Sequence, residues 1–235
     1  MRQVFARTYG CDLCCRYCDT PAAKAETGPC VVEKPAGSGN RAALRNPLTA
    51  AEVLEQIIEV AVPIEAHHSV SFTGGEPLLH ASFVGELAAM CREAGLKTYL
   101  ETNGQRIAEL KTVVESIDIV AMDVKLSSSL GVDCGVEWEA MLTRGMAFLR
   151  AAREVEVFVK LICTSETPVA EVARVAEAVA GEKDDCLMVL QPVTPAAEVD
   201  AAPDARHMLA LQAAASTFLP DVRVIPQCHL AMGML

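Results

Sequence analysis

Short apolar runs alternate with longer amphipathic segments along the whole chain, and this alternation constrains the fold most strongly. Helices are expected between the runs, for example at residues 80–94 and 105–116, because apolar residues recur there every three or four positions. Strict strand–helix alternation favours a parallel sheet covered by helices. About six such units would curl into an incomplete (β/α)6-type barrel, an α/β fold. The expected strands are residues 4–8, 69–73, 97–100, 117–122, 155–162, 186–190 and 222–225.

Local signals place some of the boundaries. Thr49 and Glu52 have the spacing of a capping box, which predicts the start of a helix whose buried face includes Ile58. A last long helix is expected to bury Phe218. Residues 21–47 lack a clear period and predict an insertion loop within a single domain spanning residues 1–235.

Composition excludes several classes of function. The net charge is −11 and the chain has no run of Lys or Arg, which argues against a sequence-independent nucleic-acid partner. Ten cysteines without regular pairing suggest a reducing, cytoplasmic location. We expect no membrane association, because no signal peptide is visible after Met1 and no apolar stretch reaches the roughly 18 residues of a membrane span.

Three cysteines near the start of the chain predict an iron–sulfur centre. Cys11, Cys15 and Cys18 form a C-x3-C-x2-C pattern on one short loop. Three thiolates can hold three irons of a 4Fe–4S cube and leave the fourth iron open to a small molecule. Cys14 is interpreted as a neighbour of the cluster. A zinc site or plain structural cysteines are the alternatives, but zinc sites usually have two separated C-x2-C pairs.

This cysteine spacing after an apolar run resembles that of the radical S-adenosylmethionine (radical SAM) superfamily. The resemblance implies the superfamily's incomplete parallel barrel, a 4Fe–4S cluster and S-adenosylmethionine bound through its amino and carboxylate groups to the open iron. It also implies a flavodoxin- or ferredoxin-type electron donor. The protein itself would bind and orient the cluster and the cofactor, and it would exclude water from them.

Two further loops follow expected strands. Gly74, Gly75 and Glu76 belong to a T-G-G-E-P string, where glycines let the backbone approach a ligand closely. The superfamily holds the methionine amino group with such a backbone, although an ordinary glycine turn is the alternative. Downstream, Glu101, Thr102 and Asn103 carry a carboxylate, a hydroxyl and an amide, which together suit the ribose of the cofactor. The alternative is an Asn-Gly turn in which the threonine caps the next helix.

Asp123 and Lys125 follow the next expected strand, and alternation points both to one side. They could contact the ribose or carboxylate of the cofactor, or simply form a salt bridge with each other. The two interpretations remain open from the sequence.

Three other motifs resemble the 7-carboxy-7-deazaguanine synthase family. They are Cys-Asp-Thr ending at Thr20, L-Q-P-V around Gln191, and P-Q-C-H ending at His229. The resemblance implies ring contraction of 6-carboxy-5,6,7,8-tetrahydropterin with release of ammonia, in queuosine and related deazapurine biosynthesis. It implies Thr20 as a magnesium ligand and a homodimer. Gln191 and His229 would line the pocket, with Gln191 also near the cofactor, although each could be a satisfied buried polar group.

Two departures from that family leave other functions open. The 235 residues begin ten positions before Cys11 and lack the family's Ser-x-Gln-Gly-Glu-Gly loop, and the insertion at residues 21–47, with Cys30, is long. The alternatives are a radical SAM relative acting on another small molecule and an activating enzyme for a glycyl-radical partner. The P-Q-x-H tail disfavours the activating enzyme. A non-enzymatic iron–sulfur or zinc module would leave the later loop motifs without a role.

Overall fold

A seven-stranded parallel sheet forms the centre of the computed structural model, which describes residues 2–25, 27–131, 135 and 137–228. The strand order is β1-β4-β5-β6-β7-β8-β9, and each adjacent pair runs parallel. Strands β1 and β9 lie at the two edges of this sheet, which matches the expected incomplete barrel. The strands are β1 (Gln3–Thr8), β4 (Ser69–Gly74), β5 (Thr98–Thr102), β6 (Ile119–Asp123), β7 (Glu156–Cys163), β8 (Met188–Pro192) and β9 (Val222–Val224).

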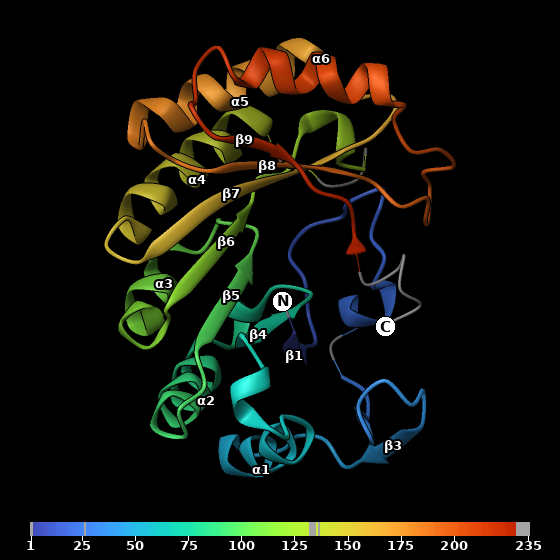
Figure 1. The fold of residues 1–235 in the computed structure, drawn as a ribbon, viewed down its shortest axis with the longest axis vertical. Helices are drawn as coiled ribbons and strands as arrows, with labels where there is room; N and C mark the ends of the chain where they lie inside the picture. Colours follow the sequence, from blue (N-terminus) through green and yellow to red (C-terminus); the bar gives the residue numbers. More distant parts are fainter. Residues whose placement is uncertain (1, 26, 132–134, 136, 229–235) are drawn as a thin grey trace.

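One main helix follows each strand up to β8, so six strand–helix units precede β9. In Figure 1 the sheet is curved, the helices cover its convex side, and the segment after β1 lies on its concave side. The predicted α/β architecture is confirmed. The helices are α1 (Ala50–Val60), α2 (Ala81–Glu93), α3 (Ile107–Val113), α4 (Trp138–Ala152), α5 (Val169–Glu182) and α6 (Ala205–Ala215).

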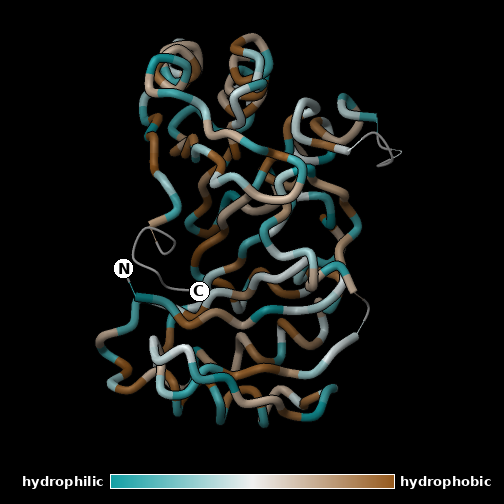
Figure 2. The backbone as a smooth tube through the Cα atoms, turned by 90° about the vertical axis from the view of Figure 1, so that its right-hand side faces the viewer, coloured by the Kyte–Doolittle hydropathy of each residue, from teal (hydrophilic) through white to brown (hydrophobic). Residues whose placement is uncertain are grey.

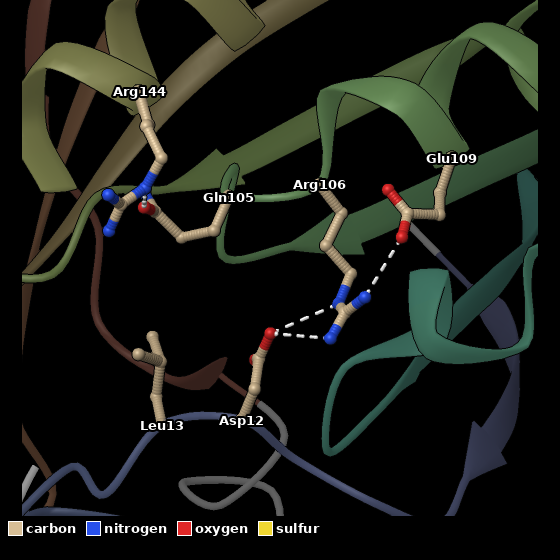
Figure 3. Close-up of a pocket in the computed structure, with 6 residues that line it drawn as sticks. All are labelled: Asp12, Leu13, Gln105, Arg106, Glu109 and Arg144. Carbon is tan, nitrogen blue, oxygen red and sulfur yellow. Dashed lines mark hydrogen bonds and ion pairs between the residues drawn. The ribbon is translucent and has the colours of Figure 1, made fainter.

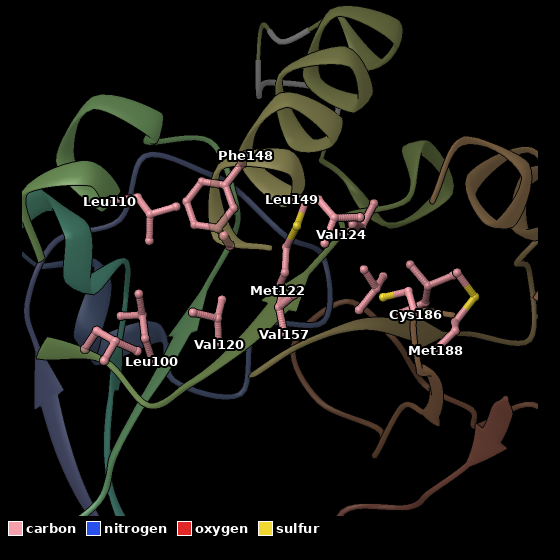
Figure 4. Packing of buried hydrophobic residues seen from close by; sticks show 14 of the residues in the cluster. Leu100, Leu110, Val120, Met122, Val124, Phe148, Leu149, Val157, Cys186 and Met188 are labelled. Carbon is pink, nitrogen blue, oxygen red and sulfur yellow. The ribbon is translucent and has the colours of Figure 1, made fainter. Parts of the chain in front are cut away.

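The convex face of the sheet carries the hydrophobic core. Phe72, Leu100 and Met122 are almost completely buried there. Phe148 of α4 packs into the same cluster as Leu100 and Met122 (Figure 4). Successive side chains on a strand point to opposite faces, so the residues between these core positions face the concave side. Figure 2 shows hydrophobic and hydrophilic stretches alternating along the helices, as one-sided burial requires.

The predicted capping box is present, because Thr49 accepts a hydrogen bond from the Glu52 amide and the Glu52 carboxylate accepts one from the Thr49 amide. Two predicted core positions are wrong. Ile58 is 38% exposed because α1 buries only one side, and Phe218 is 40% exposed because α6 ends three residues before it. Among the described residues, no helix is long and apolar enough to cross a membrane.

Residues 21–47 contain regular structure that their sequence pattern did not indicate. A 3-10 turn, η1 (Pro21–Lys24), is followed by an antiparallel hairpin of β2 (Cys30–Glu33) and β3 (Arg41–Leu44). Lys34, just after β2, donates hydrogen bonds to Gln56 and Glu59 of α1. The hairpin is therefore fastened to the outer layer of the fold.

Candidate active site

The cysteine loop begins where β1 ends, and the glycine loop after β4 packs directly against it. The Glu76 amide donates to the Gly10 carbonyl oxygen at 2.8 Å, and the Gly75 amide donates to the Thr8 carbonyl oxygen at 3.2 Å. A Cβ atom at Gly75 would lie 1.9 Å from the Gly10 oxygen, so no larger residue fits there. The structure thus brings the first two motifs into contact through their backbones.

Cys11, Cys15 and Cys18 are free, partly buried thiols on this loop. Burial raises the pKa of Cys11 and of Cys15, and the nearby Lys125 ammonium opposes that rise at Cys15. No three Cys, His, Asp or Glu side chains in the described part of the chain are arranged as a metal site. Three thiols within eight residues nevertheless match the donor set of a 4Fe–4S cluster, and metal binding commonly organises its own ligands.

Cys14 faces another part of the molecule. Its carbonyl accepts from the Gly131 amide at 2.9 Å, and its sulfur lies 3.9 Å from the Gly131 carbonyl oxygen. These contacts hold the cysteine loop against the segment after β6.

Glu76 joins the second motif to the third. This side chain is completely buried, and its carboxylate accepts from the Leu78 amide, the Thr102 hydroxyl and the Asn103 amide at 2.8–3.0 Å. Burial raises the pKa of Glu76 to about 7, against the lowering effect of the three donors. Thr102 therefore binds Glu76 and does not cap α3, whose N-cap residue is Arg106.

Asn103 joins the third motif to the cysteine loop. Its side-chain amide donates to Asp12 at 2.8 Å, and the other Asp12 oxygen pairs with Arg106 at 3.0 Å. Asp12 and Arg106 border a cavity of about 310 Å³ between the cysteine loop and the helices α3 and α4 (Figure 3). The cavity is lined by Asp12, Leu13, Gln105, Arg106, Glu109 and Arg144. The residue after Cys11 is thereby fixed by the loop expected to hold the ribose.

A chain of charged groups crosses the concave face. Lys125 donates to Asp123 at 2.7 Å, and the Lys160 ammonium lies 3.6 Å from Asp123 and 3.8 Å from Glu101. The Ser71 hydroxyl donates to Glu101 at 2.8 Å. The salt bridge considered for Asp123 and Lys125 is therefore present, and both side chains also lie beside the cysteine loop's own aromatic residue, Tyr17.

These charges control one another's protonation. Burial alone would raise the pKa of Asp123, but the ammonium groups of Lys125 and Lys160 outweigh it and hold that pKa below its usual value. Burial would lower the pKa of Lys125, but Asp123 raises it well above the ordinary value. Both residues are therefore charged at neutral pH.

Sequence reasoning missed Lys160, which belongs to no recognised motif. The signal available was a lone cation inside the apolar run Phe158-Val159-Lys160-Leu161. The fold places it next to two residues that were singled out, Glu101 and Asp123.

The remaining predicted residues lie on the same side of the sheet. Gln191 is half-buried on β8, and Thr20 directly precedes η1 without making a side-chain cap. Gln227 of the P-Q-C-H motif donates to Asp19 at 3.0 Å, so the two motifs meet although 208 positions separate these residues. His229 lies outside the described residues.

Comparison with known proteins agrees with this geometry. Residues 6–132 match the model of the radical SAM superfamily. A 7-carboxy-7-deazaguanine synthase from Geobacter sulfurreducens is 36% identical over 100% of this chain and 91% of its own length. A second, from Methanothermobacter thermautotrophicus, is 29% identical over 99% of this chain and 90% of its own length.

A pyruvate formate-lyase-activating enzyme from Clostridium pasteurianum is also similar, with 27% identity, but over only 53% of this chain and 46% of its own length. Among solved structures, Streptococcus suis SuiB bound to S-adenosylmethionine superposes with a TM-score of 0.66 at 17% identity. That match covers 96% of this chain and 50% of SuiB, and it shows a shared fold.

Proposed function

Because this chain belongs to the 7-carboxy-7-deazaguanine synthase family of the radical SAM superfamily, we propose that it contracts the ring of 6-carboxy-5,6,7,8-tetrahydropterin to 7-carboxy-7-deazaguanine with release of ammonia. The family requires a 4Fe–4S cluster and S-adenosylmethionine, which when bound supply one-electron chemistry for hydrogen abstraction. The role of the protein is to hold the cluster, the cofactor and the substrate in the correct positions relative to one another.

The joining of the motifs by buried hydrogen bonds is the observation that carries the proposal. Glu76 fixes the glycine loop to the loop of Thr102 and Asn103, and Asn103 fixes that loop to Asp12 beside Cys11. The three motifs therefore lie together at the carboxyl ends of the neighbouring strands β1, β4 and β5.

Each motif then has a binding role. Cys11, Cys15 and Cys18 hold three irons, and the backbone of Gly74 and Gly75 holds the methionine end of the cofactor. The polar groups at and just beyond the carboxyl ends of β5 and β6 hold its ribose and carboxylate. These groups are Glu101, Thr102, Asn103, Asp123 and Lys125. Gln191 lies on β8, two strands from β6, and is proposed to border both cofactor and substrate.

Magnesium and the assembly of the protein belong to the same proposal. Thr20 offers one hydroxyl ligand, and Mg²⁺ typically keeps few protein ligands and fills its shell with water and substrate oxygens. The contact between Asp19 and Gln227 supports a substrate pocket beside Thr20. His229, which ends the same P-Q-C-H motif, is included in the proposal as a substrate-binding residue on the strength of the family resemblance. We include a single-domain homodimer, a cytoplasmic location and a flavodoxin- or ferredoxin-type electron donor by analogy with the family.

The direct test is an anaerobic assay of the reconstituted protein with 6-carboxytetrahydropterin, magnesium, S-adenosylmethionine and a strong reductant. Formation of 7-carboxy-7-deazaguanine without net consumption of the cofactor is expected. Cleavage of the cofactor with the pterin untouched would contradict the proposed substrate and leave the radical chemistry in place.

Thr20→Val tests the magnesium site, because valine has nearly the same shape but no hydroxyl. We expect turnover at limiting magnesium to fall about tenfold or more, with recovery at high magnesium. Thr143→Val is the matched control, because Thr143 is exposed on α4 and its hydroxyl bonds only within that helix. Superimposable magnesium titrations of Thr20→Val and the unmodified protein would remove Thr20 from the metal site.

A further inference from the structure

Lys160 occupies the centre of the charged chain on the concave face. Its neighbours on β7, Val159 and Leu161, are completely buried in the core, so alternation turns Lys160 to the opposite side. The register pairs Lys160 with Asp123 on one side and with Val189 on the other. The side chain therefore projects from the middle of the sheet toward the concave face.

The polar groups around Lys160 are not fully used by the protein. Its distances of 3.6 Å to Asp123 and 3.8 Å to Glu101 are ion-pair distances beyond hydrogen-bond range. Asp123 Oδ1 and the Tyr17 hydroxyl are buried and have no hydrogen-bond partner within the described residues. Buried polar atoms are normally satisfied, so the charged chain around Lys160 is incompletely hydrogen-bonded in the protein alone.

A ligand can reach the charged side chains beside these two buried atoms. The side chains of Glu101, Asp123, Lys125 and Lys160 retain between 13% and 25% of their exposure. Two ammonium groups and two carboxylates balance in charge, but only Lys125 donates a close hydrogen bond to a carboxylate. The Lys160 ammonium is thus partly exposed and makes no close hydrogen bond to a carboxylate of the protein, which suits a ligand that carries a carboxylate.

We propose that Lys160 is a substrate-binding residue whose ammonium binds the carboxylate of the pterin acid. This inference rests on the proposed function, because that carboxylate belongs to 6-carboxytetrahydropterin. Ion pairs with Asp123 and Glu101 hold the Lys160 ammonium at the concave face.

The test measures binding of two ligands, anaerobically, with S-adenosylmethionine present and no reductant, so that no turnover occurs. The ligands are 6-carboxytetrahydropterin and 6-methyltetrahydropterin, which differ in the carboxylate. Lys160→Met should weaken binding of the carboxylated ligand at least about tenfold and change binding of the methyl ligand less than about twofold. Lys160→Arg should keep most of the preference for the carboxylate.

Lys97→Met is the matched control, because Lys97 is exposed next to β5 and forms no ion pair among the described residues. It should alter neither dissociation constant. If thermal unfolding shows Lys160→Met to be misfolded, Lys160→Gln replaces it, since glutamine keeps a polar donor while removing the charge. Equal weakening of both ligands, or no weakening, overturns the inference.

Turnover by the unmodified protein separates the two proposals. Conversion of the carboxypterin together with an unaffected Lys160→Met overturns only the role of Lys160. Carboxylate-dependent binding through Lys160 without conversion overturns only the proposed reaction. Absence of any binding by the unmodified protein overturns both.

Discussion

Lys160 and Leu161 are consecutive residues on β7 but belong to opposite faces of the sheet. Leu161 is fully buried among apolar side chains beneath the helices, whereas Lys160 lies among carboxylates on the concave face. The convex face gains its stability from apolar area removed from water. The concave face holds charge because each ion has an opposite partner and some contact with solvent. The comparison separates residues that hold the fold from residues that serve the site.

A pair of cysteine variants gives the largest expected difference between the faces. Cys15→Ala should abolish cofactor cleavage, a loss of about a thousandfold or more, because three thiolates are needed to hold the cluster and leave one iron open. Cys163→Ala removes a thiol that is completely buried on the convex side, and it should keep cleavage activity. Iron content and 5′-deoxyadenosine formation check both. Retained cleavage in Cys15→Ala would contradict the ligand assignment.

Two truncations on β7 test the same contrast through stability. Leu161→Ala should lower the free energy of unfolding by about 2–5 kcal/mol, because it leaves a cavity in the core. Phe158→Ala, on the concave face, should cost clearly less, since Phe158 is only partly buried, with its ring 6.2 Å from that of Tyr99. Denaturant unfolding measures both values. A larger cost for Phe158→Ala would mean that the concave face is also a packed core.

The pH dependence of stability tests the buried carboxylate that joins the loops. The folded-state pKa of Glu76 lies at about 7, above its unfolded value, so the folded protein binds the extra proton. The free energy of unfolding should therefore fall by about 3 kcal/mol as pH rises from about 4.5 to about 7. Glu76→Gln cannot take up this proton, so its free energy of unfolding should lack this part of the pH dependence. An unchanged slope in Glu76→Gln would show that Glu76 titrates normally.

The smallest effect is expected on the outer surface. Arg174 of α5 and Glu139 of α4 form an ion pair at 3.5 Å, with both side chains about half exposed. Arg174→Ala should change the free energy of unfolding by less than about 1 kcal/mol, because solvent and salt screen exposed pairs. A larger loss in denaturant unfolding would show that surface charge contributes to joining the helices.

Much of the fold was predictable because its signals are local. The capping box at Thr49 and the regular spacing of apolar residues located the helices and strands to within a few positions. The exposure of individual side chains was less predictable, as Ile58 and Phe218 show. The spacing of apolar residues does not say how wide the buried face of a helix is or where the helix ends. The hairpin formed by β2 and β3 was missed because four-residue strands offer almost no period to detect.

The sequence by itself determined that the thiols of Cys11, Cys15 and Cys18 lie within one short loop, and it determined the order of strands and helices, because both depend on residues close along the chain. Only the tertiary structure decided that Glu76 would bind Asn103, that Asp19 would meet Gln227, and that Lys160 would lie between two carboxylates. The physical reason is that parallel pairing brings the carboxyl ends of distant strands to one edge, and the register and curvature of the sheet choose which side chains meet there.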